Sequence, residues 1–220
     1  MTVIPTPIGN LQDITLRALD ALKQADVIAA EDTRHSGILL HHHGVSRPMI
    51  SFHQHNEASR TAELVEQIAG GKSVALITDA GMPGISDPGY RLVRACRERN
   101  LPVTVLPGPS AVVTALAGSG LPSHAFYFGG FLPVKSGQRR NELERSLGRK
   151  ETSVYYESPY RLLKSLLCLA ELSTDAEICV ARELTKKFEE YRRGTAAELA
   201  KHYEAHPPKG EISLLIAPRS

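Results

Sequence analysis

Short apolar or β-branched runs alternate with longer amphipathic runs along the whole chain, and this alternation is the strongest constraint on its fold. Such an alternation is typical of strands and helices that take turns in an α/β protein. We expect strands at residues 3–4, 27–30, 49–52, 74–78, 103–106, 125–128, 154–156, 178–181 and 212–216. Helices fill the gaps; one follows Asp13 as a possible cap, and another follows Ser158 and Pro159.

A turn-rich segment at residues 118–122 separates the first five expected strands from the remaining ones. A chain of 220 residues is long enough to build two small domains, each with its own core. We therefore predict an N-terminal α/β domain over residues 1–117 and a C-terminal α/β domain over residues 118–220.

Composition argues against several classes of protein. No apolar run approaches the ~20 residues of a membrane span, and the first residues lack the features of a secretory signal, so we expect a soluble cytoplasmic protein. The three cysteines are far apart and lie in apolar patterns, which indicates buried thiols. Three adjacent histidines, His41 to His43, point in different directions on a helix, so we expect no metal site.

Three of the expected strands end in loops rich in glycine and proline, at residues 5–10, 79–89 and 107–111. In an open parallel sheet the carboxyl ends of the strands share one edge, so the three loops are predicted to form a single small-molecule site. Asp79 directly follows its strand and can accept hydrogen bonds. The amides of Ser110 and Ala111, at a helix start, can hold an anionic group.

Charged and polar residues follow three other strands, and each group has two interpretations. Residues 31–35 form an acid/base site, or Asp32 caps the next helix and Arg34 pairs with an acid. Residues 53–57 face the same site, or form a polar loop in which Asn56 caps a helix. Residues 182–187 form an acid/base site or a salt-bridged surface.

The positive charge of the second half is concentrated in two segments. Residues 135–150 carry six basic and two acidic side chains, and residues 182–193 carry five basic and three acidic ones. A solvated helix face is the common explanation for such a segment, and nucleic-acid contact is the alternative. Tyr156, in a run of aromatic residues, either stacks on a base or packs in the core.

The collected motifs resemble those of the small-subunit (16S) ribosomal RNA 2′-O-methyltransferases of the tetrapyrrole-methylase superfamily. The resemblance spans nearly the whole chain. The segments that carry it are residues 5–11, 13–15, 30–35, 53–57, 79–89, 107–111, 156–159 and 181–186.

This resemblance implies two α/β domains of the tetrapyrrole-methylase type with a cofactor cleft between them, a homodimer, and S-adenosylmethionine as methyl donor without a metal. The substrate implied is a cytidine ribose in the decoding region, presented by small-subunit ribosomal RNA or the 30S particle. The cofactor-binding residues implied are Ile8, Asp79, Ala80, Gly81, Met82, Ser110, Ala111, Tyr156 and Ala181.

The motifs leave several groups open as catalytic residues, because more than one can assist proton removal from a ribose hydroxyl. Candidates are Glu183, Lys186 and Asp32, and the substrate-binding candidates are Arg34, His35, Arg60 and Arg182. Two alternatives stay open: a methyltransferase of the same superfamily that acts on a tetrapyrrole or another small molecule, and a non-catalytic RNA-binding or ribosome-assembly protein. Members of the family often carry a basic helical extension after the second domain, and the sequence ends at Ser220 before one.

Overall fold

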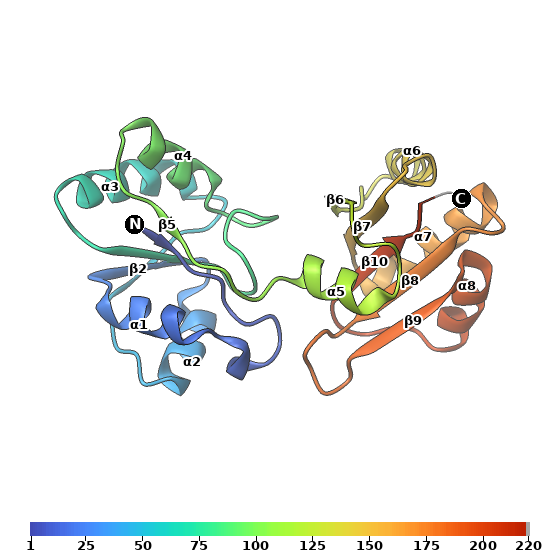
Figure 1. The fold of residues 1–220 in the computed structure, drawn as a ribbon, viewed down its shortest axis with the longest axis horizontal. Coiled ribbons are helices and arrows are strands. Elements are labelled where there is room, and N and C mark those ends of the chain that lie inside the picture. Colours follow the sequence, from blue (N-terminus) through green and yellow to red (C-terminus); the bar gives the residue numbers. More distant parts are fainter. Residues whose placement is uncertain (219–220) are drawn as a thin grey trace. The chain divides into compact units, whose positions relative to one another are not determined.

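The computed structural model describes residues 1–218, which form two compact units; the first is Met1–Ser110 and the second begins at Ala111. Both units combine helices with a five-stranded sheet, which confirms the α/β prediction (Figure 1). The chain passes from one unit to the other where helix α5 (Ala111–Ser119) begins. The boundary expected after residue 117 falls inside this helix, and residues 219–220 of the predicted second domain lie outside the described part.

The first unit is built on a parallel sheet with the strand order β3-β2-β4-β1-β5. Its strands are β1 (Thr2–Val3), β2 (Val27–Ala30), β3 (Met49–Ser51), β4 (Val74–Ile77) and β5 (Thr104–Val105). Each overlaps a segment that the sequence predicts as a strand. Because all five are parallel, their carboxyl ends share one edge.

Helices cover both faces of this sheet (Figure 1). They are α1 (Leu16–Gln24) and α2 (Thr33–His42) on one face, and α3 (Glu57–Ala69) and α4 (Tyr90–Glu98) on the other. Residues along β2 alternate between the two cores: Ile28 packs with α1 and α2, whereas Val27 packs with α3 and α4. This two-sided burial explains why the central strands of this unit are apolar throughout.

The expected start of the first helix was wrong by two residues. Asp13 ends a short 3-10 turn, η1 (Leu11–Asp13), and does not cap α1. The cap is Thr15, whose hydroxyl accepts a hydrogen bond from the amide of Ala18 at 3.1 Å. Asp and Thr are both favoured at this position, so the residue types alone do not decide between them.

The second unit is built on a mixed sheet with the order β6-β7-β10-β8-β9, in which only β6 and β7 are parallel among the described strands. The strands are β6 (Phe126–Phe131), β7 (Thr152–Glu157), β8 (Glu177–Arg182), β9 (Glu190–Thr195) and β10 (Ile212–Ile216). Three helices pack together with the sheet in an apolar core that includes Tyr155, Leu166 and Leu199. These helices are α6 (Ser136–Leu147), α7 (Pro159–Leu172) and α8 (Ala196–Ala205).

Strand β9 was not predicted from the sequence. Its residues are charged and polar, and it lies at the edge of the sheet, paired antiparallel with β8. Opposite charges across the pair replace apolar contacts, because Arg182 of β8 lies opposite Glu190 of β9 and the two side chains form an ion pair at 3.2 Å. A strand of this kind gives no apolar signal in the sequence.

Candidate functional site

Two of the glycine- and proline-rich loops of the first unit are hydrogen-bonded to each other. Thr6 of the loop after β1 and Gly81 of the loop after β4 form a reciprocal pair: the amide of Thr6 donates to the carbonyl of Gly81 at 2.9 Å, and the amide of Gly81 donates to the carbonyl of Thr6 at 3.0 Å. The hydroxyl of Thr6 also donates to the carbonyl of Thr78 at 2.9 Å. These bonds hold the two loops side by side.

The third loop meets the first two at Gly81. This glycine has a φ of +81°, and a Cβ built on it would lie 3.5 Å from Cγ2 of Ile8 and 4.0 Å from the carbonyl oxygen of Pro109. At Gly108 a Cβ would come within 2.6 Å of Cγ of Pro5, so only glycine lets the third loop approach the first this closely. The structure therefore brings together the three loops that the sequence predicts to share a site.

A fourth loop joins this group through Asp79. The Asp79 carboxylate accepts a hydrogen bond from the amide of Asp32 at 3.1 Å, and the amide of Asp79 donates to the Glu31 carboxylate at 3.4 Å. Burial raises the pKa of Glu31. Burial, together with the charges of Glu31 and Asp79, raises the pKa of Asp87 to about 7. The edge of the sheet therefore gathers carboxyl groups, and its field favours a cationic ligand.

Asp32 acts as a helix cap in this structure. Its carboxylate accepts hydrogen bonds from the guanidinium of Arg34 at 2.9 Å and from the amide of the same residue at 2.8 Å, which lowers the pKa of Asp32 to about 2. A carboxylate with this pKa is a weak base at neutral pH. Arg34 and His35 both lie on α2, whereas Arg60 lies on α3 and pairs with Glu63.

Residues 53–57 form a polar loop, as one interpretation of the sequence predicts, but the expected side-chain cap by Asn56 is wrong. Asn56 precedes α3 at the N-cap position, yet its side chain does not cap the helix; it accepts from the amide of His53 at 2.8 Å and donates to the carbonyl of Ser51 at 3.1 Å. Glu57 reaches the end of the loop after β4, where its carboxylate accepts from the amide of Gly89 at 3.0 Å. This loop is thus fixed at both ends, by Thr6 and by Glu57.

In the second unit, the turn after β8 holds Lys186 between two carboxylates. Its ammonium donates to Glu183 and to Glu211, each at 2.9 Å, and the amide of Glu211 donates to the same oxygen of Glu183 at 3.0 Å. Although burial opposes both changes, these hydrogen bonds raise the pKa of Lys186 and lower the pKa of Glu183. Lys186 is therefore a fixed cation, and Glu183 is a weak base that positions it.

The backbone of this turn adopts an uncommon conformation. Glu183 and Thr185 have φ values of +51° and +64°, which non-glycine residues seldom adopt. Gly210 packs against the turn with a φ of +86°, and a Cβ built on it would overlap the Glu183 carboxylate. Backbone strain of this kind is often found at functional sites.

Three other predicted residues, Tyr156, Ala181 and Arg182, lie on strands of the second unit's sheet. Tyr156 is on β7, with its ring 5.1 Å from that of Phe128 and 5.3 Å from that of Phe131. Ala181 is buried on β8, and Arg182 follows it with an ion pair to Glu190. Ser110 and Ala111 lie where α5 begins.

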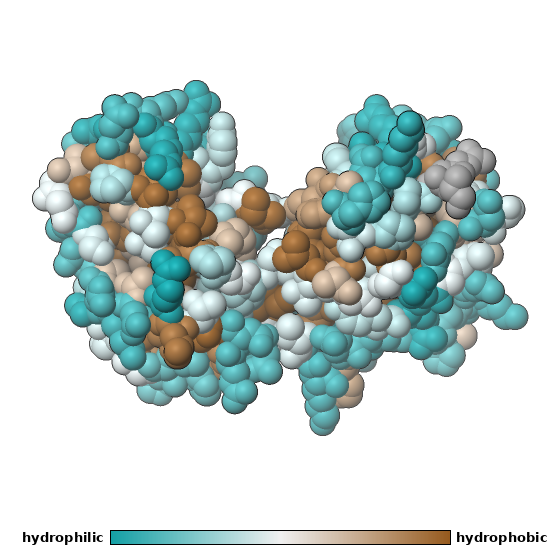
Figure 2. Space-filling model, in the orientation of Figure 1, coloured by the Kyte–Doolittle hydropathy of each residue, from teal (hydrophilic) through white to brown (hydrophobic). Residues whose placement is uncertain are grey.

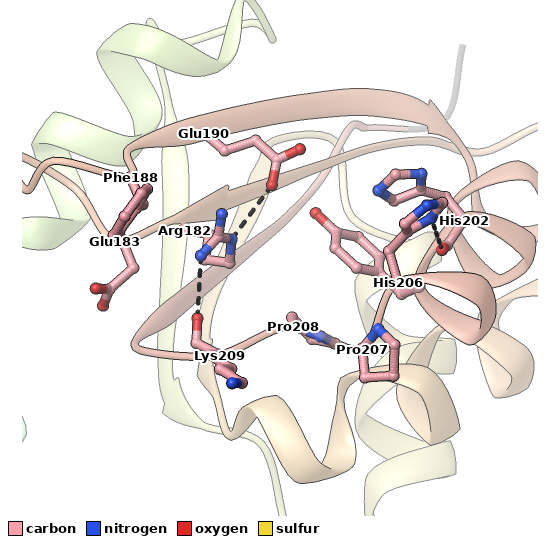
Figure 3. Close-up of a pocket in the computed structure, with 10 residues that line it drawn as sticks. Arg182, Glu183, Phe188, Glu190, His202, His206, Pro207, Pro208 and Lys209 are labelled. Atoms are coloured by element: carbon pink, nitrogen blue, oxygen red, sulfur yellow. Dashed lines mark hydrogen bonds and ion pairs between the residues drawn. The ribbon is translucent and has the colours of Figure 1, made fainter.

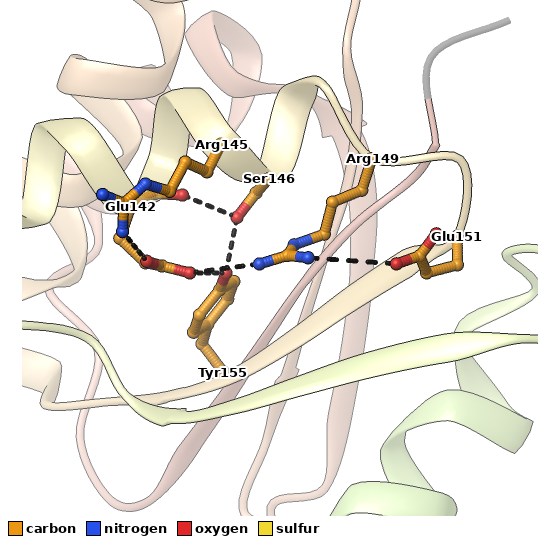
Figure 4. Close-up of polar contacts among 6 residues, drawn as sticks. All are labelled: Glu142, Arg145, Ser146, Arg149, Glu151 and Tyr155. Carbon is orange, nitrogen blue, oxygen red and sulfur yellow. Dashed lines mark hydrogen bonds and ion pairs between the residues drawn. The ribbon is translucent and has the colours of Figure 1, made fainter.

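The basic segment at residues 135–150 covers α6, whose surface is hydrophilic (Figure 2). Its arginines are largely engaged with other groups. Arg145 pairs with Glu142, and Arg149 lies near Glu142 and Glu151 (Figure 4). The guanidinium of Arg149 also lies 3.5 Å above the ring of Tyr127. Arg140 pairs with Glu171, and Arg139 is buried and donates to a backbone carbonyl. The segment therefore offers less free positive charge than its composition suggests.

Sequence reasoning missed one further feature of the second unit, a cavity of about 350 Å³ that Arg182 and Glu183 share with residues of α8 and the segment after it (Figure 3). His202 and His206 lie across the cavity from Arg182, and Lys209 lies between the two sides; all three are distant in sequence from the predicted site. No motif marks these residues, so only the fold brings them next to Arg182.

Residues 1–218 contain no helix that is long and apolar enough to cross a membrane. Among these same residues, no group of three or more His, Cys, Asp or Glu side chains is arranged to hold a metal ion. The absence of a metal from the reaction stays a prediction.

Comparisons with known proteins give one family. The sequence model of one protein family, the tetrapyrrole (corrin/porphyrin) methylases, matches residues 1–200. A protein of Mesorhizobium japonicum named ribosomal RNA small subunit methyltransferase I is 50% identical over 98% of this chain and 74% of its own length. A protein of the same name from Vibrio cholerae is 48% identical over 97% of this chain and 75% of its own length.

Solved structures share the fold at low sequence identity. Diphthine synthase has a TM-score of 0.75 at 14% identity and covers 98% of this chain and 89% of its own. Uroporphyrin-III C-methyltransferase from Thermus thermophilus has a TM-score of 0.66 at 20% identity, and the match covers 97% of this chain and 92% of the other. The chain therefore belongs to the tetrapyrrole (corrin/porphyrin) methylase family, in the branch of the relatives named ribosomal RNA small subunit methyltransferase I.

Proposed function

We propose that the chain catalyses S-adenosylmethionine-dependent 2′-O-methylation of a cytidine ribose in the decoding region of small-subunit ribosomal RNA. The observation that carries this proposal is the 45–50% identity to relatives with one shared name over at least 97% of the chain. The tetrapyrrole-type enzymes share only the fold at 20% identity or less, so the RNA substrate is favoured over a tetrapyrrole.

The loops of the first unit fit S-adenosylmethionine. Around Gly81 they offer an apolar contact from Ile8 and the exposed residue Ala80, and the neighbouring carboxyl groups suit a sulfonium cation. Asp79, Met82, Ser110 and Ala111 complete this set of cofactor residues. That Tyr156 and Ala181 of the second unit also contact the cofactor stays a prediction.

Bound S-adenosylmethionine would supply a methyl group activated for in-line displacement, so the protein must mainly align the acceptor oxygen with it. The raised pKa of Lys186 keeps its ammonium charged, which makes it suitable for lowering the pKa of the ribose hydroxyl or for holding a phosphate. Glu183 and Glu211 fix the position of the ammonium. Arg182, with exposed Arg34 and His35, would contact the RNA.

We further propose that the chain acts in the cytoplasm, where its 30S substrate would lie, and that it forms a homodimer. These statements rest on the family resemblance.

Calorimetric titration with S-adenosylmethionine and S-adenosylhomocysteine tests the cofactor site. We expect saturable binding by the wild-type chain and at least a roughly tenfold loss of affinity in Asp79→Ala, because removal of this carboxylate frees the amide of Asp32 and weakens the loop. Asp20→Ala, an exposed carboxylate on α1, is the matched control and should bind normally. Near-normal affinity in a folded Asp79→Ala variant would contradict the assignment.

A further inference from the structure

The cavity in the second unit lies beside the strained turn and is formed by three separate segments. Phe188, Glu183 and Arg182 lie on one side, His202 and His206 on the other, and residues 207–209 between them (Figure 3). Its volume of about 350 Å³ is at the small end of ligand pockets, which run from roughly 300 to 1,000 Å³. This size suits a single nucleotide better than a larger cofactor.

The walls offer flat side chains to a ligand. Phe188 is 64% exposed. The rings of His202 and His206 stack on each other with centroids 4.8 Å apart. Burial and the positive charge of Arg192 lower the pKa of His202, which favours the neutral form of its ring. An uncharged planar wall is typical of sites that stack nucleobases.

One wall of the cavity carries a buried hydroxyl that makes no hydrogen bond of regular geometry. Tyr203 is 2% exposed and lines the cavity; among the residues that the structure describes its hydroxyl has no partner at regular hydrogen-bond geometry, although the Arg192 side chain lies near enough to lower its pKa. Burial raises the pKa of Tyr203 to about 12, so the group is a neutral donor and acceptor. Because a buried polar group without a partner is costly, a ligand atom that pairs with it would bind favourably.

One cation at the cavity is held in place, and a second lies beside its exposed ring. Arg182 donates to Glu190 at 3.2 Å and to the carbonyl of Lys209 at 3.2 Å, which ties the two sides of the cavity together. The ammonium of Lys187 lies 5.6 Å from the centre of the Phe188 ring. Positive charge next to an exposed aromatic ring is typical of single-stranded nucleic-acid binding.

We propose that this cavity binds one unpaired nucleobase of the RNA substrate, which stacks on Phe188 and hydrogen-bonds to Tyr203, while the neighbouring phosphates contact Lys187 and Lys209. The proposal rests on the proposed function and deepens it. It gives Arg182 a role in holding the two sides of the base-binding cavity together. A base held here keeps the RNA strand near Lys186, which belongs to the same turn as Phe188 and precedes it by two residues.

A binding assay with two matched RNAs tests the pocket. Wild-type protein is titrated into a fluorescein-labelled cytidine oligonucleotide of about ten nucleotides, and into the same backbone with abasic sites. Phe188→Ala should weaken binding of the cytidine oligonucleotide by about 5- to 150-fold, which corresponds to about 1–3 kcal/mol of base stacking. Tyr203→Phe keeps the ring in the core and should weaken binding by about 2- to 10-fold.

Neither variant should change the affinity for the abasic backbone. Tyr160→Ala is the control, because this aromatic is 92% exposed at the start of α7 and does not line the cavity. Thermal melts establish that each variant is folded. Equal losses with both RNAs, no loss in either pocket variant, or an equal loss in Tyr160→Ala would overturn the proposal.

Methyl transfer to ribosomal particles separates this proposal from the proposed function. If both hold, Phe188→Ala raises the KM for the particle and leaves S-adenosylmethionine affinity unchanged. A wild-type chain that binds the oligonucleotide through Phe188 and methylates no particle would overturn the proposed function alone. Methylation with an unchanged KM in both pocket variants would overturn the pocket alone.

Discussion

Glu157 is predicted to stabilise the second unit, although it lies within the segment Tyr156 to Pro159 that the family resemblance marks as functional. Its side chain is fully buried at the end of β7. The carboxylate accepts hydrogen bonds from the amide of Ser158 at 2.8 Å and the hydroxyl of Ser165 at 2.6 Å, and it pairs with Arg161 at 2.8 Å. It thereby joins the strand to α7.

Glu157→Ala would leave the Arg161 guanidinium, whose side chain is only 22% exposed, without this partner. Removal of one member of a buried ion pair costs about 3–5 kcal/mol. For a chain of this size each kcal/mol lowers the Tm by about 2–4 °C, so the variant should melt about 6–20 °C below wild type.

Circular dichroism melts measure this difference, and Glu151→Ala is the control. Glu151 is a partly exposed carboxylate 3.9 Å from Arg149, and its removal should cost no more than about 1 kcal/mol. At a temperature where the Glu157→Ala chain is folded, its affinity for S-adenosylhomocysteine should equal that of wild type. A Tm within about 2 °C of wild type would refute the structural role, because it corresponds to no more than about 1 kcal/mol.

Three further changes have defined outcomes. The pKa of Asp87 is about 7 in the fold against an ordinary ~4, so the protonated carboxyl stabilises the fold fully below pH ~4, and this contribution is lost as pH rises through about 7. The free energy of unfolding in urea should therefore fall less between pH 5 and pH 8 in Asp87→Asn than in wild type. Equal falls in the two proteins would contradict the assignment. Lys186→Met should lower methyl transfer by roughly 10²-fold or more while S-adenosylhomocysteine still binds, and unchanged turnover would exclude its charge from the reaction. Gly210→Ala, at a φ of +86° and against Glu183, should lower both stability and methyl transfer, and wild-type values of both would show that the turn tolerates a Cβ.

Much of the first unit could be predicted from the sequence, because its central strands are buried on both faces and therefore read as continuous apolar runs. The meeting of three loops at Gly81 follows from the parallel order of β4, β1 and β5, which places their carboxyl ends next to one another. Periodicity alone does not give that order, because it marks where the strands are and not which of them pair.

The second unit was harder to predict at its polar edge. Strand β9 is held by ion pairs such as Arg182 to Glu190, and charged residues in sequence do not distinguish a strand from a helix surface or a loop. The pairing of Lys186 with Glu211 depends on two segments 25 residues apart. The net charge of residues 135–150 likewise overstated their free positive charge, because arginines such as Arg140 already have carboxylate partners.

The most direct test of the central claim is transfer of a labelled methyl group. Small ribosomal particles that lack the modification are incubated with the chain and methyl-labelled S-adenosylmethionine, and the RNA is digested to nucleosides. The account predicts label in 2′-O-methylcytidine, and its loss with Asp79→Ala. Label in another nucleoside, or none from a folded chain that binds the cofactor, would contradict it.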